Sequence, residues 1–371
     1  MKFPNKYLRN LKPYKLASHK IWTVKPEERE QILKLDWNEA SMPPSPKVRE
    51  RIAELLNEPE FFNLYPTTYN ERFMNALSSY IGLPKENLQY FASSDALHEY
   101  ICKVFVSVGD PVLILGPSYD NFRLTCQANG AEVFWSNYTD DFKFDREKFE
   151  EDIYKYEPAI VYICNPNNPT GNFHEPLYIE HLLNTFSDTL FLLDEAYMEF
   201  AEGSSSKDLV LKYDNILISR TMSKAFALAN FRVGYLIASK DNVQFINKIR
   251  NPKNLTTFGQ EAATAALEDY QYMEDYVKEV KGAQKWFKNE LEKNFSKYMK
   301  PIESAGNFTM IEFPMYEAKI DLLNYLAENN IFVRDCTQGP SVRNCFRITI
   351  GTKKQMERVF GVIKAYYANK R

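Results

Sequence analysis

The sequence lacks the features that mark membrane or nucleic-acid-binding proteins. No apolar run approaches the roughly 20 residues of a spanning helix, and residues 1–6 contain no apolar stretch of the kind that begins a signal peptide. The chain carries 46 Lys and Arg against 49 Asp and Glu, a net charge of −3. Such a balance gives no overall attraction to nucleic acid or to an anionic membrane. We therefore expect a cytoplasmic protein with neither partner.

Cysteine and histidine are scarce, and their spacing argues against common metal or disulfide sites. The five cysteines are odd in number and include no C-x-x-C pair, which is typical of free thiols in a reducing compartment. Of the four histidines, His174 and His181 are the closest pair. They miss the i, i+4 spacing that places zinc ligands on one helix face. We expect no metal site.

The stretch most informative about chemistry is 219–226, with the sequence SRTMSKAF. Lys224 follows hydroxyl groups at Thr221 and Ser223, and Arg232 comes shortly afterwards, ahead of Gly234. An amine can capture a carbonyl, while hydroxyls and a guanidinium can bind a phosphate. Pyridoxal phosphate, an aldehyde with a phosphate tail, suits this combination. The alternative is a solvated surface lysine.

Two motifs upstream supply the other groups that this cofactor needs. Asp194 follows the apolar run 189–193, so it lies at the carboxyl end of a predicted buried strand, where sites of α/β proteins collect. A carboxylate there can keep a pyridine nitrogen protonated. After a second buried-strand run, 159–164, the loop 165–171 (NPNNPTG) can aim the Asn168 amide at a ligand. Each motif alone also fits a helix-capping acid or an ordinary turn, but three in order favour a cofactor site.

On these residues the chain resembles the fold-type I pyridoxal phosphate-dependent aminotransferases, and among them the histidinol-phosphate aminotransferases, over nearly its whole length. The resemblance implies a catalytic set of Lys224, which binds the cofactor aldehyde, Asp194, which faces the ring nitrogen, and Tyr197. Tyr197 and Asn168 are expected to donate to the ring oxygen. The other cofactor contacts that it implies are Tyr119 stacked on the ring and, at the phosphate, Ser94, Asp95, Ala96, Thr221, Ser223 and Arg232.

The resemblance also predicts that one chain cannot complete its own site. Tyr65 is similar to the tyrosine that reaches the cofactor phosphate of the neighbouring subunit. We therefore expect a two-fold homodimer with shared active sites, whose symmetry would complete both sites equally. A core or turn aromatic is the alternative for Tyr65, because the chain contains 24 tyrosines.

Substrate contacts are expected from the C-terminal part of the chain. Arg347 resembles the arginine that holds the α-carboxylate of the amino donor, a bidentate task that suits a planar guanidinium. Arg334 is similar to an arginine that helps hold a substrate phosphate, although an ion pair with Asp335 is the alternative. The remaining expected contacts are Tyr14, near the substrate phosphate, and Asn38, at the edge of the site.

The order of apolar runs and helical patterns predicts an α/β fold with a large and a small domain. At 371 residues the chain would normally divide into more than one lobe. We expect an N-terminal arm over 1–33, a large cofactor-binding domain over 34–253 and a small α+β domain over 254–371. The large domain should contain a mostly parallel seven-stranded sheet, with strands predicted at 88–93, 111–115, 131–135, 159–163, 190–193, 216–219 and 234–238. The small domain should contain long amphipathic helices, such as 270–298, and two short strands at about 308–313 and 345–350.

The expected activity is transfer of an amino group from a donor, glutamate by resemblance, to a small phosphorylated substrate. Histidinol phosphate itself is doubtful, since the phosphate turn 91–96 (FASSDA) lacks the usual glycines and Asn230 replaces another. A three-carbon phosphate would suit the same arginines. The alternative reaction is decarboxylation of a phospho-amino acid, as in threonine-phosphate decarboxylase, and a non-catalytic regulator would need a DNA-binding segment that the N-terminal arm does not provide.

Overall fold

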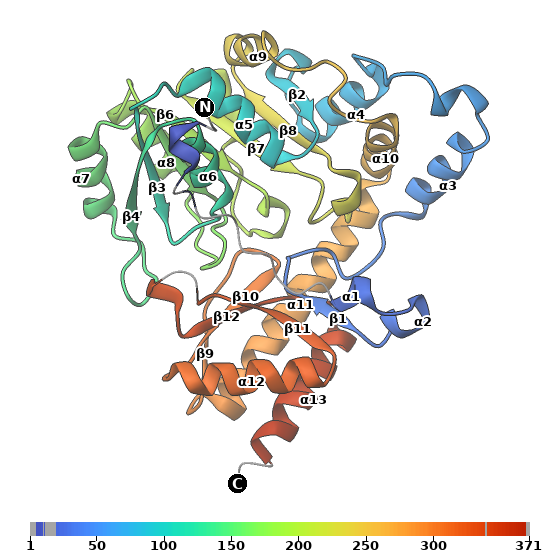
Figure 1. Ribbon diagram of the computed structural model, residues 1–371, viewed down its shortest axis with the longest axis vertical. Helices are drawn as coiled ribbons and strands as arrows, with labels where there is room; N and C mark the ends of the chain where they lie inside the picture. The colour runs from blue at the N-terminus through green and yellow to red at the C-terminus, as the bar shows by residue number, and fades with distance from the viewer. Residues whose placement is uncertain (1–4, 10, 12–19, 338–339, 369–371) are drawn as a thin grey trace.

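The computed structural model describes residues 5–9, 11, 20–337 and 340–368. Figure 1 shows a large lobe built around one sheet and a smaller lobe, carrying the C-terminus, built around another. This arrangement confirms the predicted fold class. Tyr14 lies outside the described residues, so its expected contact stays a prediction.

The large sheet has seven strands in the order β2-β8-β7-β6-β5-β3-β4. All neighbouring pairs are parallel except those that β8 makes with β7 and β2, which are antiparallel. All seven lie where the sequence predicts strands, and they are β2 (Leu88–Phe91), β3 (Pro111–Gly116), β4 (Glu132–Asn137), β5 (Ile160–Cys164), β6 (Leu190–Asp194), β7 (Ile216–Thr221) and β8 (Gly234–Ala238).

Helices flank this sheet, as near-continuous apolar strands require. Every residue of β5, β7 and β8 is buried, so neither face of these strands meets water. The helices of the N-terminal segment and large lobe are α1 (Lys20–Thr23), α2 (Pro26–Arg29), α3 (Pro46–Leu55), α4 (Glu71–Ile81), α5 (Ser94–Phe105), α6 (Asn121–Ala128), α7 (Arg146–Tyr156), α8 (Pro176–Thr185), α9 (Lys240–Asn247) and α10 (Thr257–Leu267).

The small sheet has five strands in the order β1-β11-β12-β10-β9, and only the β1–β11 pair is parallel. The sequence predicts only β10 and β12. The strands are β1 (Leu33–Leu35), β9 (Lys300–Pro301), β10 (Phe308–Glu312), β11 (Ile331–Asp335) and β12 (Cys345–Thr349). Three helices complete this lobe, and they are α11 (Tyr270–Phe295), α12 (Tyr316–Glu328) and α13 (Lys353–Ala368).

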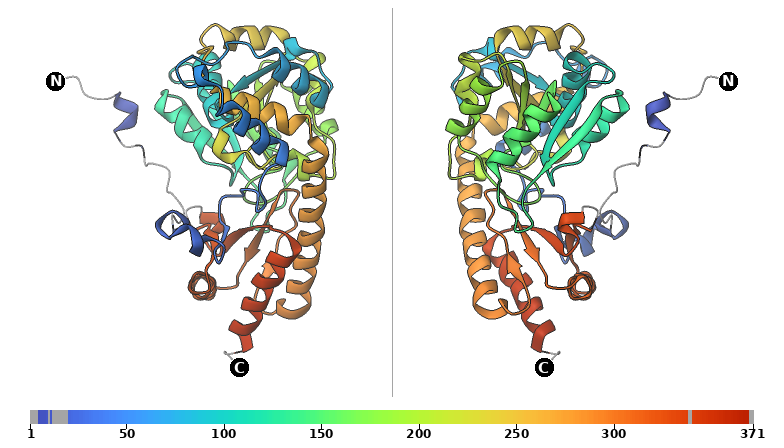
Figure 2. Two further views of the ribbon diagram at one scale, coloured as in Figure 1. Left: turned by 90° about the vertical axis from the view of Figure 1, so that its right-hand side faces the viewer. Right: turned by 90° about the vertical axis from the view of Figure 1, so that its left-hand side faces the viewer.

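The long helix α11 connects the two lobes, and Figure 2 shows it running along one side of the molecule from one to the other. Its buried residues recur at helical spacing along one face, from Met273 to Phe295. It packs on α13 and β9 of the small lobe and on the 3-10 turn Met198–Phe200 of the large one. The expected domain limits stay predictions.

No helix within the described ranges is both long enough and apolar enough to cross a membrane. The cytoplasmic location stays a prediction. All five cysteines are free thiols, which confirms the expectation from their spacing.

A buried ion pair joins the carboxyl ends of β6 and β7. Arg220 donates to the Glu195 Oε2 atom from Nε at 3.0 Å and from Nη2 at 2.7 Å. The Glu195 carboxylate also accepts from the Ser205 hydroxyl at 2.7 Å and the Ser206 amide at 3.1 Å. The carboxylate thus accepts four hydrogen bonds, and the pair holds the ends of β6 and β7 together. The last residues of these two strands, Asp194 and Thr221, line the cavity described below.

We expect Glu195→Ala to lower the free energy of unfolding by about 3 kcal/mol, because Arg220 would lose its hydrogen-bonded carboxylate in the interior and keep only the more distant Glu199. Glu199 is 3.9 Å from Arg220, too distant for a hydrogen bond. The matched control is Glu202→Ala, which removes a carboxylate that is 90% exposed beside Lys281 and should cost about 1 kcal/mol or less. Denaturant unfolding measures both, and equal losses would contradict the prediction.

Candidate active site

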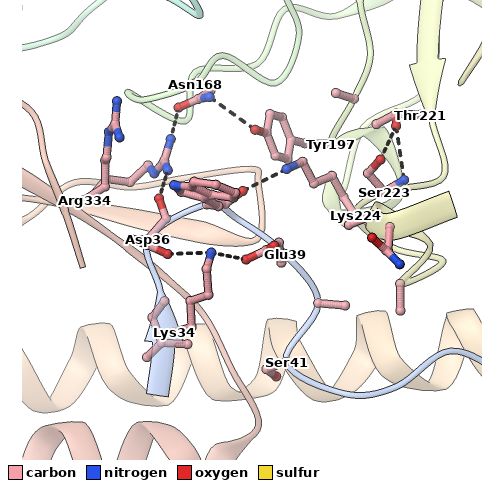
Figure 3. A pocket seen from close by; sticks show the side chains of 18 of the residues that line it. Lys34, Asp36, Glu39, Ser41, Asn168, Tyr197, Thr221, Ser223, Lys224 and Arg334 are labelled. Carbon is pink, nitrogen blue, oxygen red and sulfur yellow. Dashed lines mark hydrogen bonds and ion pairs between the residues drawn. The ribbon is translucent and has the colours of Figure 1, made fainter. Parts of the chain in front are cut away.

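One large cavity, of about 810 Å³, lies where the carboxyl ends of β5, β6 and β7 meet the small lobe. Carboxyl ends of parallel strands are the usual place for ligands in open α/β sheets. Twelve predicted site residues line the cavity: Ser94, Asp95, Tyr119, Asn168, Asp194, Tyr197, Thr221, Ser223, Lys224, Arg232, Arg334 and Arg347. Figure 3 shows Lys224 and Arg334 on opposite sides of it.

Lys224 lies just beyond the end of β7, and its side chain crosses the cavity. The Nζ atom donates to the Trp37 carbonyl at 2.9 Å and lies 5.9 Å from the centre of the Tyr197 ring. Burial, with a smaller contribution from the positive charge of Arg347, lowers the pKa of Lys224 to about 8. Roughly a tenth of the amine is therefore neutral at pH 7, far more than for an ordinary lysine, and this form can act as a nucleophile or base.

Asp194, the last residue of β6, is buried beneath the cavity. Its carboxylate accepts from the Tyr162 hydroxyl at 2.8 Å and from Ser219 at 3.3 Å. Ser219 in turn pairs with the buried His98 ring at 2.8 Å. Burial raises the pKa of Asp194, although His98 and the hydrogen bonds partly oppose it. A cation beside this carboxylate would favour its ionised form, as the protonated nitrogen of a pyridine ring would.

A chain of hydrogen bonds centred on the Tyr197 hydroxyl runs along the cavity wall. The Tyr197 hydroxyl accepts from the Nδ2 atoms of Asn168 at 3.2 Å and Asn38 at 3.1 Å. Arg347 donates to Asn168 Oδ1, and to the Asp36 carbonyl at 2.6 Å. The Tyr197 hydroxyl oxygen therefore already accepts two hydrogen bonds, and its O–H proton is left to donate to a ligand in the cavity.

We expected Asn38 at the edge of the site, but it lies deeper. It is completely buried, and its backbone, with a φ of 55°, is held by the Thr349 hydroxyl at 2.9 Å. Its carbonyl accepts from Asn307 at 3.1 Å. These bonds turn the amide inward to Tyr197, and a direct contact with substrate stays a prediction.

The predicted phosphate end begins at the N-terminus of α5, where free backbone amides favour an anion. The amides of Ser94 and Asp95 open the helix. The Ala96 amide donates to the Ser93 hydroxyl at 3.2 Å, and its contact with a phosphate stays a prediction. Gly234 makes the turn possible, since a Cβ there would lie 2.3 Å from the Ser94 nitrogen.

Hydroxyls and a guanidinium complete this end of the cavity. The Thr221 hydroxyl donates a hydrogen bond to Ser223 Oγ at 2.9 Å. Arg232 lies 3.4 Å from the Asp95 carboxylate, which also accepts from the Tyr119 hydroxyl at 3.1 Å. The Asp95 side chain therefore orients both Tyr119 and Arg232, a role that the sequence motif did not reveal.

Pyridoxal phosphate fits this set of groups. Amides, hydroxyls and a guanidinium gather at one end, an amine lies across the middle, and a buried carboxylate lies at a strand end below. Arg347 Nε is also buried without a hydrogen-bond partner among the described residues, as expected for a group that awaits an anion. The individual contacts with the cofactor remain predictions.

The two arginines expected to bind substrate lie side by side. Arg334 on β11 is directly opposite Arg347 on β12 in the antiparallel register. The sequence missed β11 as a strand and so could not place them together. It also missed Lys34 on β1, which lines the same cavity, donates to Asp36 at 2.9 Å and pairs with Glu39. The alternation in Leu33–Leu35 of apolar and charged residues was the available signal.

Tyr65 does not line the cavity of its own chain. Its side chain is 80% exposed, and its ring lies 4.1 Å from the Lys253 ammonium. The structure thus leaves open to solvent the residue that we expect to act in a neighbouring subunit.

Comparison with known proteins agrees with this site. The family model described as aminotransferase class I and II matches residues 30–363. The chain is 38% identical to a dihydroxyacetone phosphate transaminase of Campylobacter jejuni, over 98% of this chain and 96% of the relative. It is 33% identical to a histidinol-phosphate aminotransferase of Ruminiclostridium cellulolyticum, over 91% and 93%.

Among solved structures, the fold is similar to that of a histidinol-phosphate aminotransferase from Sinorhizobium meliloti in complex with pyridoxal 5'-phosphate. The TM-score is 0.82 at 24% identity, covering 94% of this chain and 98% of the other.

The lowered pKa of Lys224 predicts how cofactor attachment depends on pH. In cofactor-free protein we expect the attachment rate to rise as the pH passes about 8 and then to level off, because the neutral amine is the nucleophile. Stopped-flow absorbance after mixing with pyridoxal phosphate measures this rate. Arg347→Met should move the midpoint upward, since the guanidinium lowers the pKa. A midpoint at the ordinary 10.5 of lysine would contradict the prediction.

Proposed function

The chain belongs to the class I and II aminotransferases and is a pyridoxal phosphate-dependent transaminase, and from this premise we propose that it aminates a small phosphorylated ketone. The expected amino donor is glutamate. A three-carbon ketone phosphate is the acceptor that we favour over histidinol phosphate and its keto form.

The observation that carries this proposal is the pair of guanidinium groups on adjacent strands. Like charges directly opposite each other in a sheet are destabilising, and both Arg334 and Arg347 line the cavity. Anions between them would offset that repulsion. An α-carboxylate at Arg347 and a phosphate at Arg334 would supply the charge, because guanidinium groups bind both in a bidentate way.

The comparison with relatives supports a small acceptor. The Campylobacter relative is named for dihydroxyacetone phosphate, a three-carbon ketone, and it matches this chain over 98% of its length. The histidinol-phosphate relatives have lower identities, such as 33% for the protein of Ruminiclostridium cellulolyticum. Both names describe phosphorylated compounds, which agrees with two adjacent arginines.

The residues around the cavity divide the work of transamination. Pyridoxal phosphate, when bound, supplies an aldehyde that captures amines and a ring that accepts the electrons released at the substrate Cα. Lys224 Nζ, with its lowered pKa, would take the proton from the substrate Cα as a base and give it up again as an acid. Asp194 would hold the ring nitrogen in its protonated form, and Tyr197 would donate its O–H to the ring oxygen. Arg347 orients the donor by its carboxylate.

A screen of amino donors against phosphorylated acceptors tests the proposed function. We expect the cofactor absorbance to change with glutamate alone, and to change back when a three-carbon ketone phosphate is added.

Lys224→Ala should bind the cofactor without a covalent bond and show no turnover, because both the nucleophile and the proton carrier are gone. Full activity in that variant would refute the assignment of Lys224. Carbon dioxide release from a phospho-amino acid, with no need for a 2-oxo acid, would show the alternative decarboxylation.

The site also supports a homodimer with shared active sites. Large apolar side chains near Tyr65 are exposed in the single chain, and they are Leu56 at 53%, Phe62 at 66%, Leu64 at 62% and Tyr69 at 52%. Exposed apolar patches of this kind commonly mark interfaces. A second copy seated on this surface would cover these side chains and bring Tyr65 to a neighbouring site.

Mixing two inactive variants tests the shared site. Lys224→Ala supplies an intact Tyr65, and Tyr65→Ala supplies an intact Lys224, so a hybrid dimer contains one complete site. With random reassociation, about a quarter of the wild-type activity should return, because half of the dimers carry one intact site of two. Tyr270→Ala, at a tyrosine that is 49% exposed elsewhere, controls for loss of a surface ring. No recovery, or an active monomer in sedimentation, would exclude the shared site.

A further inference from the structure

Lys319 is a completely buried lysine outside the cavity. It lies on α12, and its side chain has no exposed surface. Burying an ammonium is costly unless its hydrogen bonds are satisfied. All three of its donor positions are used, with Asp335 Oδ1 at 2.7 Å, Thr337 Oγ1 at 2.6 Å and the Arg343 carbonyl at 2.7 Å.

These three acceptors come from both arms of the connection between the strands that carry the arginines. Asp335 ends β11 and Thr337 follows it, whereas Arg343 precedes β12. Thr337 also donates to Asp335, at 2.5 Å from its hydroxyl and at 3.1 Å from its amide. One ammonium thus holds the end of β11 and the approach to β12 against α12.

The ring of Tyr316, also on α12, adds a second contact between the same segments. Its centre lies 4.5 Å from the Lys319 ammonium and 4.9 Å from the Arg343 guanidinium. Both distances are within the range of attraction between a cation and an aromatic face. Arg343, which precedes β12, is therefore held to α12 twice: its guanidinium contacts Tyr316, and its carbonyl accepts from Lys319.

The bond to Asp335 bears directly on Arg334. Successive residues of a strand point to opposite faces, so Asp335 faces α12 while Arg334 lines the cavity. Burial opposes ionisation of Asp335, yet the hydrogen bonds from Lys319 and Thr337 outweigh it and lower the pKa of this carboxyl. The ion pair between Arg334 and Asp335 that the sequence left open is therefore replaced by one between Lys319 and Asp335.

We propose that Lys319 is a positioning residue for recognition of the substrate anion. By holding Asp335, Thr337 and Arg343 it fixes the strand pair that places Arg334 opposite Arg347, and it keeps the carboxylate of Asp335 away from the cavity. The inference rests on the proposed function for the identity of the anion, a phosphate. Lys319 does not touch the substrate, but by positioning Arg334 it contributes to the preference for phosphorylated acceptors.

Steady-state kinetics of the cofactor-loaded dimer test this role. Lys319→Met keeps the buried stem and removes the charge. We expect KM for the three-carbon ketone phosphate to rise about tenfold, with kcat and KM for glutamate changed less than about twofold, because uniform binding of one substrate group is lost. Inorganic phosphate, as a competitor of the acceptor, should inhibit the variant about tenfold more weakly than the wild type.

Further variants separate positioning from folding. Lys354→Met removes a positive charge at an exposed position of α13 and should leave every constant unchanged. If Lys319→Met does not fold, as judged by its melting temperature and the cofactor absorbance, Thr337→Val and Asp335→Asn decide, each with a smaller rise in the same KM. Folded variants with unchanged phosphate inhibition would overturn the proposal and leave Lys319 a packing residue.

The wild-type measurements separate failure of this inference from failure of the proposed function. If the wild type neither accepts a phosphorylated ketone nor is inhibited by phosphate, the substrate proposal fails, and the role of Lys319 falls with it. If the wild type shows both effects and they persist in Lys319→Met, only the role of Lys319 is refuted.

Discussion

The site depends on the parallel pairing of β6 with β7, which sets Asp194 beside Ser219 in register. That register brings a carboxylate at the end of one strand level with the turn that carries Lys224 just beyond the next. A shift by one residue would exchange the two faces of a strand and move Asp194 out of the cavity. The buried pair of Arg220 with Glu195 opposes such a shift, because a shift would break the two hydrogen bonds that join them.

The small lobe contributes positive charge to a cavity whose floor comes from the large lobe. Arg347 joins the two lobes. It donates to the carbonyl of Asp36, which directly follows β1 of the small sheet, and to Asn168, which follows β5 of the large sheet. Both arginines lie on adjacent strands, so their repulsion is built into the sheet. The fold tolerates this arrangement because other contacts, among them the bonds of Lys319, hold the strand ends in place. The substrate anion proposed above would offset this repulsion.

The sequence predicts the large lobe well because its strands are long, apolar and followed by chemically distinctive turns. Asp194, Asn168 and Lys224 could each be placed at a strand end, and they do meet in one cavity. The strands β1, β9 and β11 were missed. β1 has three residues and β9 has two, and β1 pairs only with β11, which is distant in the sequence. No local pattern indicates such a partner. The pairing of Asp335 could not be predicted either, because its partner Lys319 comes from the helix α12 and joins the strand from outside the sheet.

The absence of glycine from the phosphate turn suggested a reshaped pocket, and the backbone explains how the turn is kept instead. Ser93 adopts φ 95° and ψ 161°, a region that is nearly exclusive to glycine and costs about 1–3 kcal/mol. Its hydroxyl recovers part of that cost by capping the Ala96 amide. Ala227 and Arg232, which line the cavity, also have positive φ, at 58° and 55°. Strain of this kind persists only where surrounding structure imposes it. Three of the seven described non-glycine residues with positive φ, namely Ser93, Ala227 and Arg232, lie at or next to the predicted phosphate end. A ligand bound there would account for a backbone that is held away from its own minimum.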